Sequence, residues 1–125
     1  MTLEQLTHRN EKFQELASQL AELLPGSNLL AFSTSMIRTC KKLDKLVQKV
    51  LSSKSDTGFF NQIDLLEEEI DELIFMMDRL DEANRKGKMD AITDVVKQGY
   101  ELVSLYSLVC DQILERKTKN EDEFK

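Results

Sequence analysis

Large apolar side chains recur at alternating spacings of three and four residues through four stretches of the chain. The third stretch shows this pattern without a break, at Phe59, Ile63, Leu66, Ile70, Leu73, Met77 and Leu80. A repeat of about 3.5 residues places such side chains along one side of an α-helix and is typical of helices that pack nearly side by side. The pattern predicts four helices, at about residues 3–24, 28–51, 59–84 and 89–117.

Short polar segments that contain the one proline and three of the four glycines separate these stretches. They read PGSN at 25–28, SSKSDTG at 52–58 and NRKGK at 84–88. Four helices of similar length with short connections favour an all-α fold, an antiparallel up-down-up-down four-helix bundle that forms a single domain over 1–117. The charged residues 118–125 are expected to form a flexible C-terminal tail.

Composition narrows the class of protein further. The chain has 125 residues and a formal net charge of −6, which argues against nucleic-acid or anionic-membrane binding by the whole surface. We expect no transmembrane segment, because no run of 18 apolar residues occurs, and no signal peptide precedes the first helix. Cys40 and Cys110 fall at apolar helix positions, so two buried free thiols and a cytoplasmic location are expected.

Seven acidic residues lie among the apolar residues of 59–80. With Ile63, Leu66 and Ile70 facing inward, the helical spacing points most of them to solvent, namely Asp64, Glu68, Asp71, Glu72 and Asp78, with Glu67 and Glu69 at the flanks. Bundles that hold two metal ions use inward Glu residues and Glu-x-x-His pairs, whereas His8 is the only histidine and has no acid three residues before it. We therefore predict no metal, no cofactor and no catalytic residue.

One enzyme class is kept as a remote alternative, the magnesium-dependent all-α nucleotide pyrophosphatases. Their Glu-x-x-Glu and Glu-x-x-Asp pairs are similar to the two overlapping pairs of this chain, Glu68-x-x-Asp71 and Glu69-x-x-Glu72. Partner acids on other helices are few, namely Asp44, Asp90 and Asp94. Coordination of a hard cation would therefore be incomplete.

Charge is divided unevenly between the second and third predicted helices. Residues 28–51 carry five bases and one acid, a net charge of +4, and residues 59–82 carry nine acids and one base, a net charge of −8. The five bases fall on the polar side of the second helix and are Arg38, Lys41, Lys42, Lys45 and Lys49. They predict either a strip that binds nucleic acid or an acidic partner, or a solvated face that the neighbouring acidic helix partly neutralises.

Several apolar residues do not fit the inward pattern. Phe75 lies almost opposite Leu66 and Leu73, and a second apolar stripe on the fourth helix consists of Leu102, Leu105, Leu108 and Val109. A helix with two apolar faces usually buries the second against another molecule, so these five residues are predicted to form an oligomer interface. The alternative for Leu102 and Val109 is that they widen the core of the bundle.

The layout resembles bacterial four-helix-bundle proteins of the ribosomal intervening-sequence type, whose relatives include the accessory variability proteins of diversity-generating retroelements. The likeness is one of spacing over about residues 15–115: Pro25 after the first helix, the Ile37–Arg38 pair, and Arg79–Leu80 near the end of the third helix. The family's Pro-Ser-Asn-Ile-Ala-Glu-Gly signature is absent, since this chain has LDKLVQK at 43–49.

The resemblance implies a ring-shaped homo-oligomer, often a pentamer, without assigned catalytic residues. It also implies an association of the basic retroelement members with nucleic acid and a reverse transcriptase, from which this acidic chain departs. Together these observations predict a non-catalytic, self-associating bundle that acts as an interaction or scaffold module. A nucleic-acid-associated accessory protein that uses the basic side of the second helix is the alternative.

Overall fold

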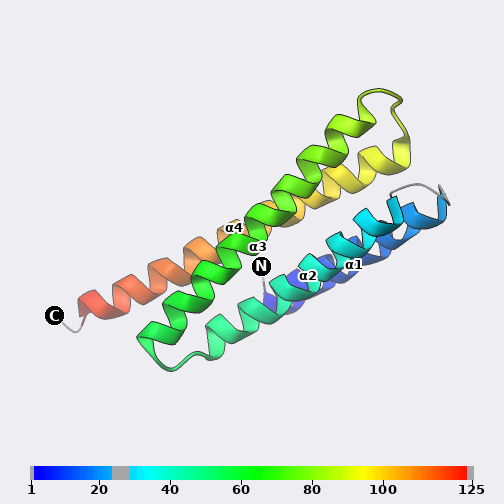
Figure 1. Ribbon diagram of the computed structural model, residues 1–125. Helices are drawn as coiled ribbons and strands as arrows, with labels where there is room; N and C mark the ends of the chain where they lie inside the picture. Colours follow the sequence, from blue (N-terminus) through cyan, green and yellow to red (C-terminus); the bar gives the residue numbers. More distant parts are fainter. Residues whose placement is uncertain (1, 24–28, 124–125) are drawn as a thin grey trace.

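The computed structural model describes residues 2–23 and 29–123, with the side chains of 2–22 and 30–117. Four α-helices make up this part of the chain: α1 (Leu3–Leu23), α2 (Leu29–Ser52), α3 (Asp56–Asn84) and α4 (Asp90–Glu123). Consecutive helices run in opposite directions and pack side by side, and α1 closes the bundle against α4 (Figure 1). The prediction of an all-α four-helix bundle is confirmed.

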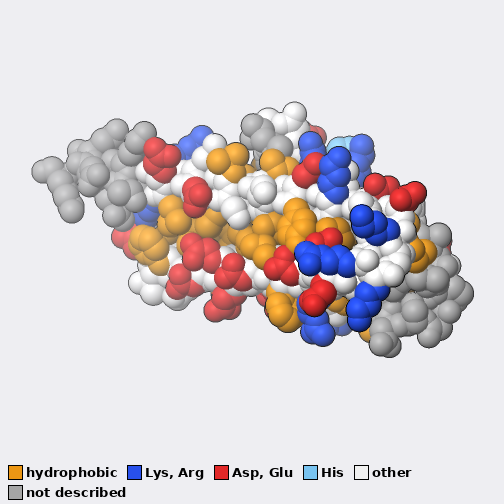
Figure 2. All heavy atoms as spheres, turned by 90° about the horizontal axis from the view of Figure 1, so that it is seen from above, with side chains coloured by type: hydrophobic (Ala, Val, Ile, Leu, Met, Phe, Trp, Pro, Cys, Tyr) orange, Lys and Arg blue, Asp and Glu red, His pale blue; other side chains and the backbone are white. Residues whose placement is uncertain are grey.

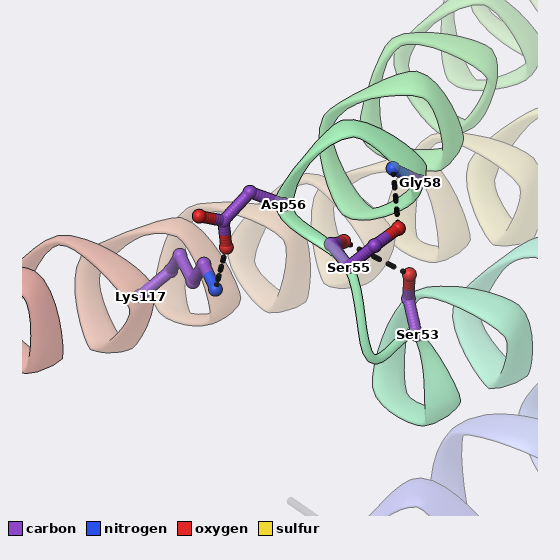
Figure 3. Close-up of polar contacts among 5 residues, drawn as sticks. All are labelled: Ser53, Ser55, Asp56, Gly58 and Lys117. Atoms are coloured by element: carbon purple, nitrogen blue, oxygen red, sulfur yellow. Dashed lines mark hydrogen bonds and ion pairs between the residues drawn. The ribbon is translucent and has the colours of Figure 1, made fainter.

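Capping side chains set where the helices begin. Before α1, Thr2 Oγ1 accepts from the Gln5 backbone N–H at 3.2 Å while Gln5 Oε1 accepts from the Thr2 backbone N–H at 2.9 Å, a reciprocal capping box. Ser55 caps α3 by accepting from the Gly58 N–H at 3.1 Å (Figure 3). Helix α3 therefore starts at Asp56, three residues before the predicted position.

The C-terminal boundary of α4 differs most from the prediction. The helix continues to Glu123, so the predicted helix end at 117 is six residues too early. No Gly or Pro follows Gly99, and nothing in the composition of the last residues interrupts the helical hydrogen bonds. Lys117 also ties α4 to the start of α3, with its Nζ 2.6 Å from Asp56 Oδ1 (Figure 3). The predicted break at 25–28 lies outside the described residues.

The interior is filled by the predicted inward-facing positions of all four helices. Fully buried members include Leu6, Leu20, Met36, Leu43, Leu66, Leu73, Met77 and Tyr106. Gly99 makes room for the Met77 side chain of α3, because a Cβ at that position would lie 2.1 Å from Met77 Sδ and the methionine would have to move.

A buried polar cluster joins three of the helices at mid-height. Asn10 of α1 donates from Nδ2 to the Cys40 carbonyl oxygen of α2 at 2.8 Å and to Tyr106 Oη of α4 at 2.6 Å. Its Oδ1 accepts from Gln14 Nε2 at 2.6 Å. Buried polar groups that are hydrogen-bonded to one another fix the register of packed helices, so this cluster aligns α1 against α2 and α4.

Candidate interaction surfaces

The carboxylates of α3 lie where the helical spacing predicts. Asp64, Glu68, Asp71, Glu72 and Asp78 are exposed, and Ile63, Leu66, Ile70 and Leu73 between them are buried. Glu69, at the flank, is half-buried. Among the residues that the structure describes, no three His, Cys, Asp or Glu side chains come together in a group that could hold a metal ion.

Helices α2 and α3 present opposite charges beside one another. Lys42 Nζ lies 3.6 Å from Glu69 Oε1, and this pair sits at the bottom of a shallow hollow of about 340 Å³. The charged residues that line the hollow are Arg38, Lys42, Glu68, Glu69 and Glu72. All five predicted bases, including Lys41, Lys45 and Lys49, are exposed.

The predicted oligomer interface is only partly retained. Phe75 and Leu108 are 55% and 53% exposed, whereas Leu102 is 2% exposed and belongs to the core. The assignment of Leu102 to an interface is therefore wrong, because Leu102 and Val95, seven residues before it, join the core beside the predicted inward positions of α4. Leu105 and Val109 are partly buried against the same core.

The outer face of α3 and α4 carries both apolar and acidic groups. Figure 2 shows hydrophobic side chains along the middle of this face, with acidic side chains gathered on its α3 side. Phe75 lies among acids, and the Arg79 guanidinium carbon is 5.4 Å from the centroid of its ring, within cation–π distance. Tyr100 of α4 donates a short hydrogen bond to Asp78 Oδ1 of α3. This bond raises the pKa of Tyr100 to about 12, with smaller contributions from burial and from the Asp78 charge.

A hollow with a volume of about 900 Å³ lies between α1 and α4. Its charged residues are of both signs, namely Arg9, Lys12, Glu15 and Asp94, and the exposed His8 also lines it. Arg9 Nη1 is 3.7 Å from Glu101 Oε2 across the same two helices. The mixed charges of the hollow favour no particular ligand.

The two cysteines are free and buried, as predicted. Burial raises the pKa of the Cys40 thiol to about 12. Burial, and next the nearby Glu67 charge, raise the pKa of the Cys110 thiol to about 11. Because the thiolate is the reactive form, both side chains are poor nucleophiles at neutral pH.

None of the described helices is long and apolar enough to cross a membrane. Comparison of the chain with protein-family models, with curated proteins and with solved structures finds no match. The function is therefore argued from the surfaces themselves.

One surface residue of interest was not singled out from the sequence. Leu65 of α3 is 45% exposed. It lies three, four and seven residues before Glu68, Glu69 and Glu72, so it shares their side of the helix. That spacing was available in the sequence, but it identifies an exposed leucine only once the rotation of α3 is known.

Proposed function

We propose that the protein is a non-catalytic helical bundle that self-associates and serves as an interaction module. The observation that carries the proposal is the exposure of large apolar side chains outside a filled interior. Phe75 and Leu108 are each more than half exposed, on the outer sides of adjacent helices. Interface cores are enriched in aromatic and large aliphatic residues of this kind.

Burial of these two side chains against another molecule would stabilise a complex. Complete burial of a Leu or Phe side chain stabilises a complex by roughly 1.5–3 kcal/mol before the cost of association is subtracted. The cation–π contact of Phe75 with Arg79 holds the ring on the surface in a defined orientation. A defined aromatic group loses less side-chain entropy on binding than a freely rotating one.

Light scattering on the purified protein tests the proposal. At tens of micromolar we expect a mass above the 14.4 kDa of one chain. The double variant Phe75→Ser, Leu108→Ser should have a lower average mass at the same concentration, with an unchanged melting temperature. The control is Leu30→Ser, which removes an exposed leucine from the first turn of α2. A single species of 14.4 kDa for the unmodified protein would refute self-association.

A further inference from the structure

Two strips of charge lie on the side of the bundle that α2 and α3 share. The basic strip consists of Arg38, Lys42, Lys45 and Lys49, at spacings of four, three and four residues along α2. The acidic strip consists of Leu65, Glu68, Glu69 and Glu72 along α3. Such spacings place each set along one line of its helix. Arg38, Lys42, Glu68, Glu69 and Glu72 line one hollow, which shows that the two strips face the same way.

The two strips are also level with each other along the bundle. The Lys42–Glu69 ion pair shows which residues of α2 and α3 lie side by side. Because the two helices are antiparallel, residues 38–49 of α2 lie beside residues 62–73 of α3. One face of the molecule therefore has a positive half and a negative half at the same height.

We infer that this α2–α3 face is a self-complementary dimer interface, in which the basic strip of each copy docks on the acidic strip of the other. The geometry follows from a two-fold axis that is parallel to the helices and lies in the interface. Rotation by 180° about this axis places α2 of the second copy over α3 of the first and keeps every residue at its own height. Residues 38–49 of one copy then meet residues 62–73 of the other, and the reverse contact follows by symmetry.

The other face-to-face arrangement is disfavoured by charge. A two-fold axis perpendicular to the helices would place α2 over α2 and α3 over α3, so that like charges meet. Juxtaposed like charges at an interface cost several kcal/mol, at an order-of-magnitude estimate. The charge pattern therefore selects the arrangement with the axis parallel to the bundle.

The size of the face and its apolar content suit a second copy of the chain. A helix of 24 residues, the length of α2, is about 36 Å long, and two adjacent helices are about 20 Å wide. The product, about 700 Å², is close to the roughly 800 Å² that each partner buries in a standard interface. Leu65 supplies an exposed apolar group in the acidic strip, and the aliphatic stems of the facing lysines can cover it.

A polyanion fits this face less well than a second copy does. Nucleic acid bound along the basic strip would lie against the acidic strip, where Glu68 and Glu72 are exposed. The repulsion acts at the height of Arg38 and Lys42, which the register places beside Glu72 and Glu69. A second copy satisfies both strips at once.

The inference rests on the proposed function only in that the chain self-associates. Phe75 borders the acidic strip, three residues after Glu72 and seven after Glu68, whereas Leu108 belongs to α4 and lies outside the α2–α3 face. The test uses two charge-reversed variants and sedimentation at tens of micromolar in low salt. One variant is Arg38→Glu, Lys45→Glu and the other is Glu68→Lys, Glu72→Lys; both leave the Lys42–Glu69 pair intact. The control for net charge is Lys86→Glu, Lys88→Glu, which changes two exposed lysines in the α3–α4 turn.

Each reversed variant should dimerise more weakly than the unmodified protein by about tenfold or more, while the control dimerises normally. An equimolar mixture of the two variants should recover the dimer, because both contacts of the mixed pair join opposite charges. A single chain with all four reversals should recover it as well, which excludes misfolding as the cause. The unmodified dimer should weaken at about 0.5 M salt, where the Debye length is only a few ångströms.

Reversed variants that associate as tightly as the unmodified protein, or a mixture that fails to recover the dimer, would overturn the inference. If in that case Phe75→Ser, Leu108→Ser still lowers the mass, the proposed function stands and only this interface falls. If the unmodified protein is a monomer at every salt concentration, both fall. Retention of an oligonucleotide on a filter by the unmodified protein, lost on Arg38→Glu, Lys45→Glu and without a mixed dimer, would assign the basic strip to nucleic acid instead.

Discussion

The α2–α3 side and the α1–α4 side of the bundle both combine acidic and basic residues, but in different arrangements. On the α2–α3 side each helix carries one sign, and the two signs meet at the Lys42–Glu69 pair. On the α1–α4 side both signs occur on the same helix, as with Arg9, Lys12 and Glu15 of α1. The first arrangement gives a face with two oppositely charged halves, whereas the second mixes both signs on α1.

The two sides also differ in how their helices are joined. Besides the exposed Arg9–Glu101 ion pair, helix α1 is joined to α2 and α4 by the uncharged hydrogen bonds of buried Asn10, while the link between the charged strips of α2 and α3 is a partly exposed ion pair. Buried hydrogen bonds are costly to break, and exposed ion pairs contribute little to folding. Stability therefore depends on the interior, and the exposed charges of α2 and α3 are free to act in recognition.

The largest expected effect on stability comes from Asn10→Ala. The change removes the donor to the Cys40 carbonyl and to Tyr106 Oη and leaves a cavity among α1, α2 and α4. We expect the free energy of unfolding to fall by about 2–4 kcal/mol, measured by urea denaturation.

The matched comparison is Lys42→Ala, which removes the exposed ion pair with Glu69. Its effect on the free energy of unfolding should be below about 1 kcal/mol. Equal losses for the two variants would contradict the division between a stabilising interior and a recognition surface.

A smaller effect on the free energy of unfolding is expected at alkaline pH, from the hydrogen bond between Tyr100 and Asp78. The raised pKa of Tyr100, about 12, means that the folded protein keeps a proton that the unfolded chain loses near pH 10. Stability is thus fully present below about pH 10 and declines as the pH rises toward 12. The decline should be shallower in Tyr100→Phe.

Tyrosinate absorbance measures this directly, because the chain has two tyrosines and no tryptophan. Tyr106 does not interfere, since burial raises its pKa further than that of Tyr100. Ionisation of the native protein near pH 10, as in the urea-unfolded chain, would show that the hydrogen bond to Asp78 does not persist in solution.

Much of the fold followed from the apolar spacing in the sequence. Because the inward positions of α3 repeat without a break from Phe59 to Leu80, the rotation of that helix and the exposure of its carboxylates could be predicted. The end of α4 could not, since helix propensity without a breaking residue does not mark a boundary.

The candidate surface was harder to predict, because it depends on relations between helices. Leu102 and Leu108 belong to one apolar stripe in the sequence, yet Leu102 is buried in the core, which was the stated alternative for it, and Leu108 is exposed. Likewise, the opposite charges of α2 and α3 are evident from composition. The register between α2 and α3, shown by the Lys42–Glu69 ion pair, is what places these charges beside one another on one face of the bundle.

The most direct test of the α2–α3 interface is zero-length cross-linking between lysines and carboxylates by a carbodiimide. An equal mixture of unlabelled and nitrogen-15-labelled chains separates links between copies from links within one chain. We expect mixed-isotope links that join Lys45 of one copy to Glu68 of the other and Lys42 of one copy to Glu72 of the other, because these residues lie within three positions of the same height. Mixed-isotope links found only at other surfaces, or links confined to single chains, would contradict the account.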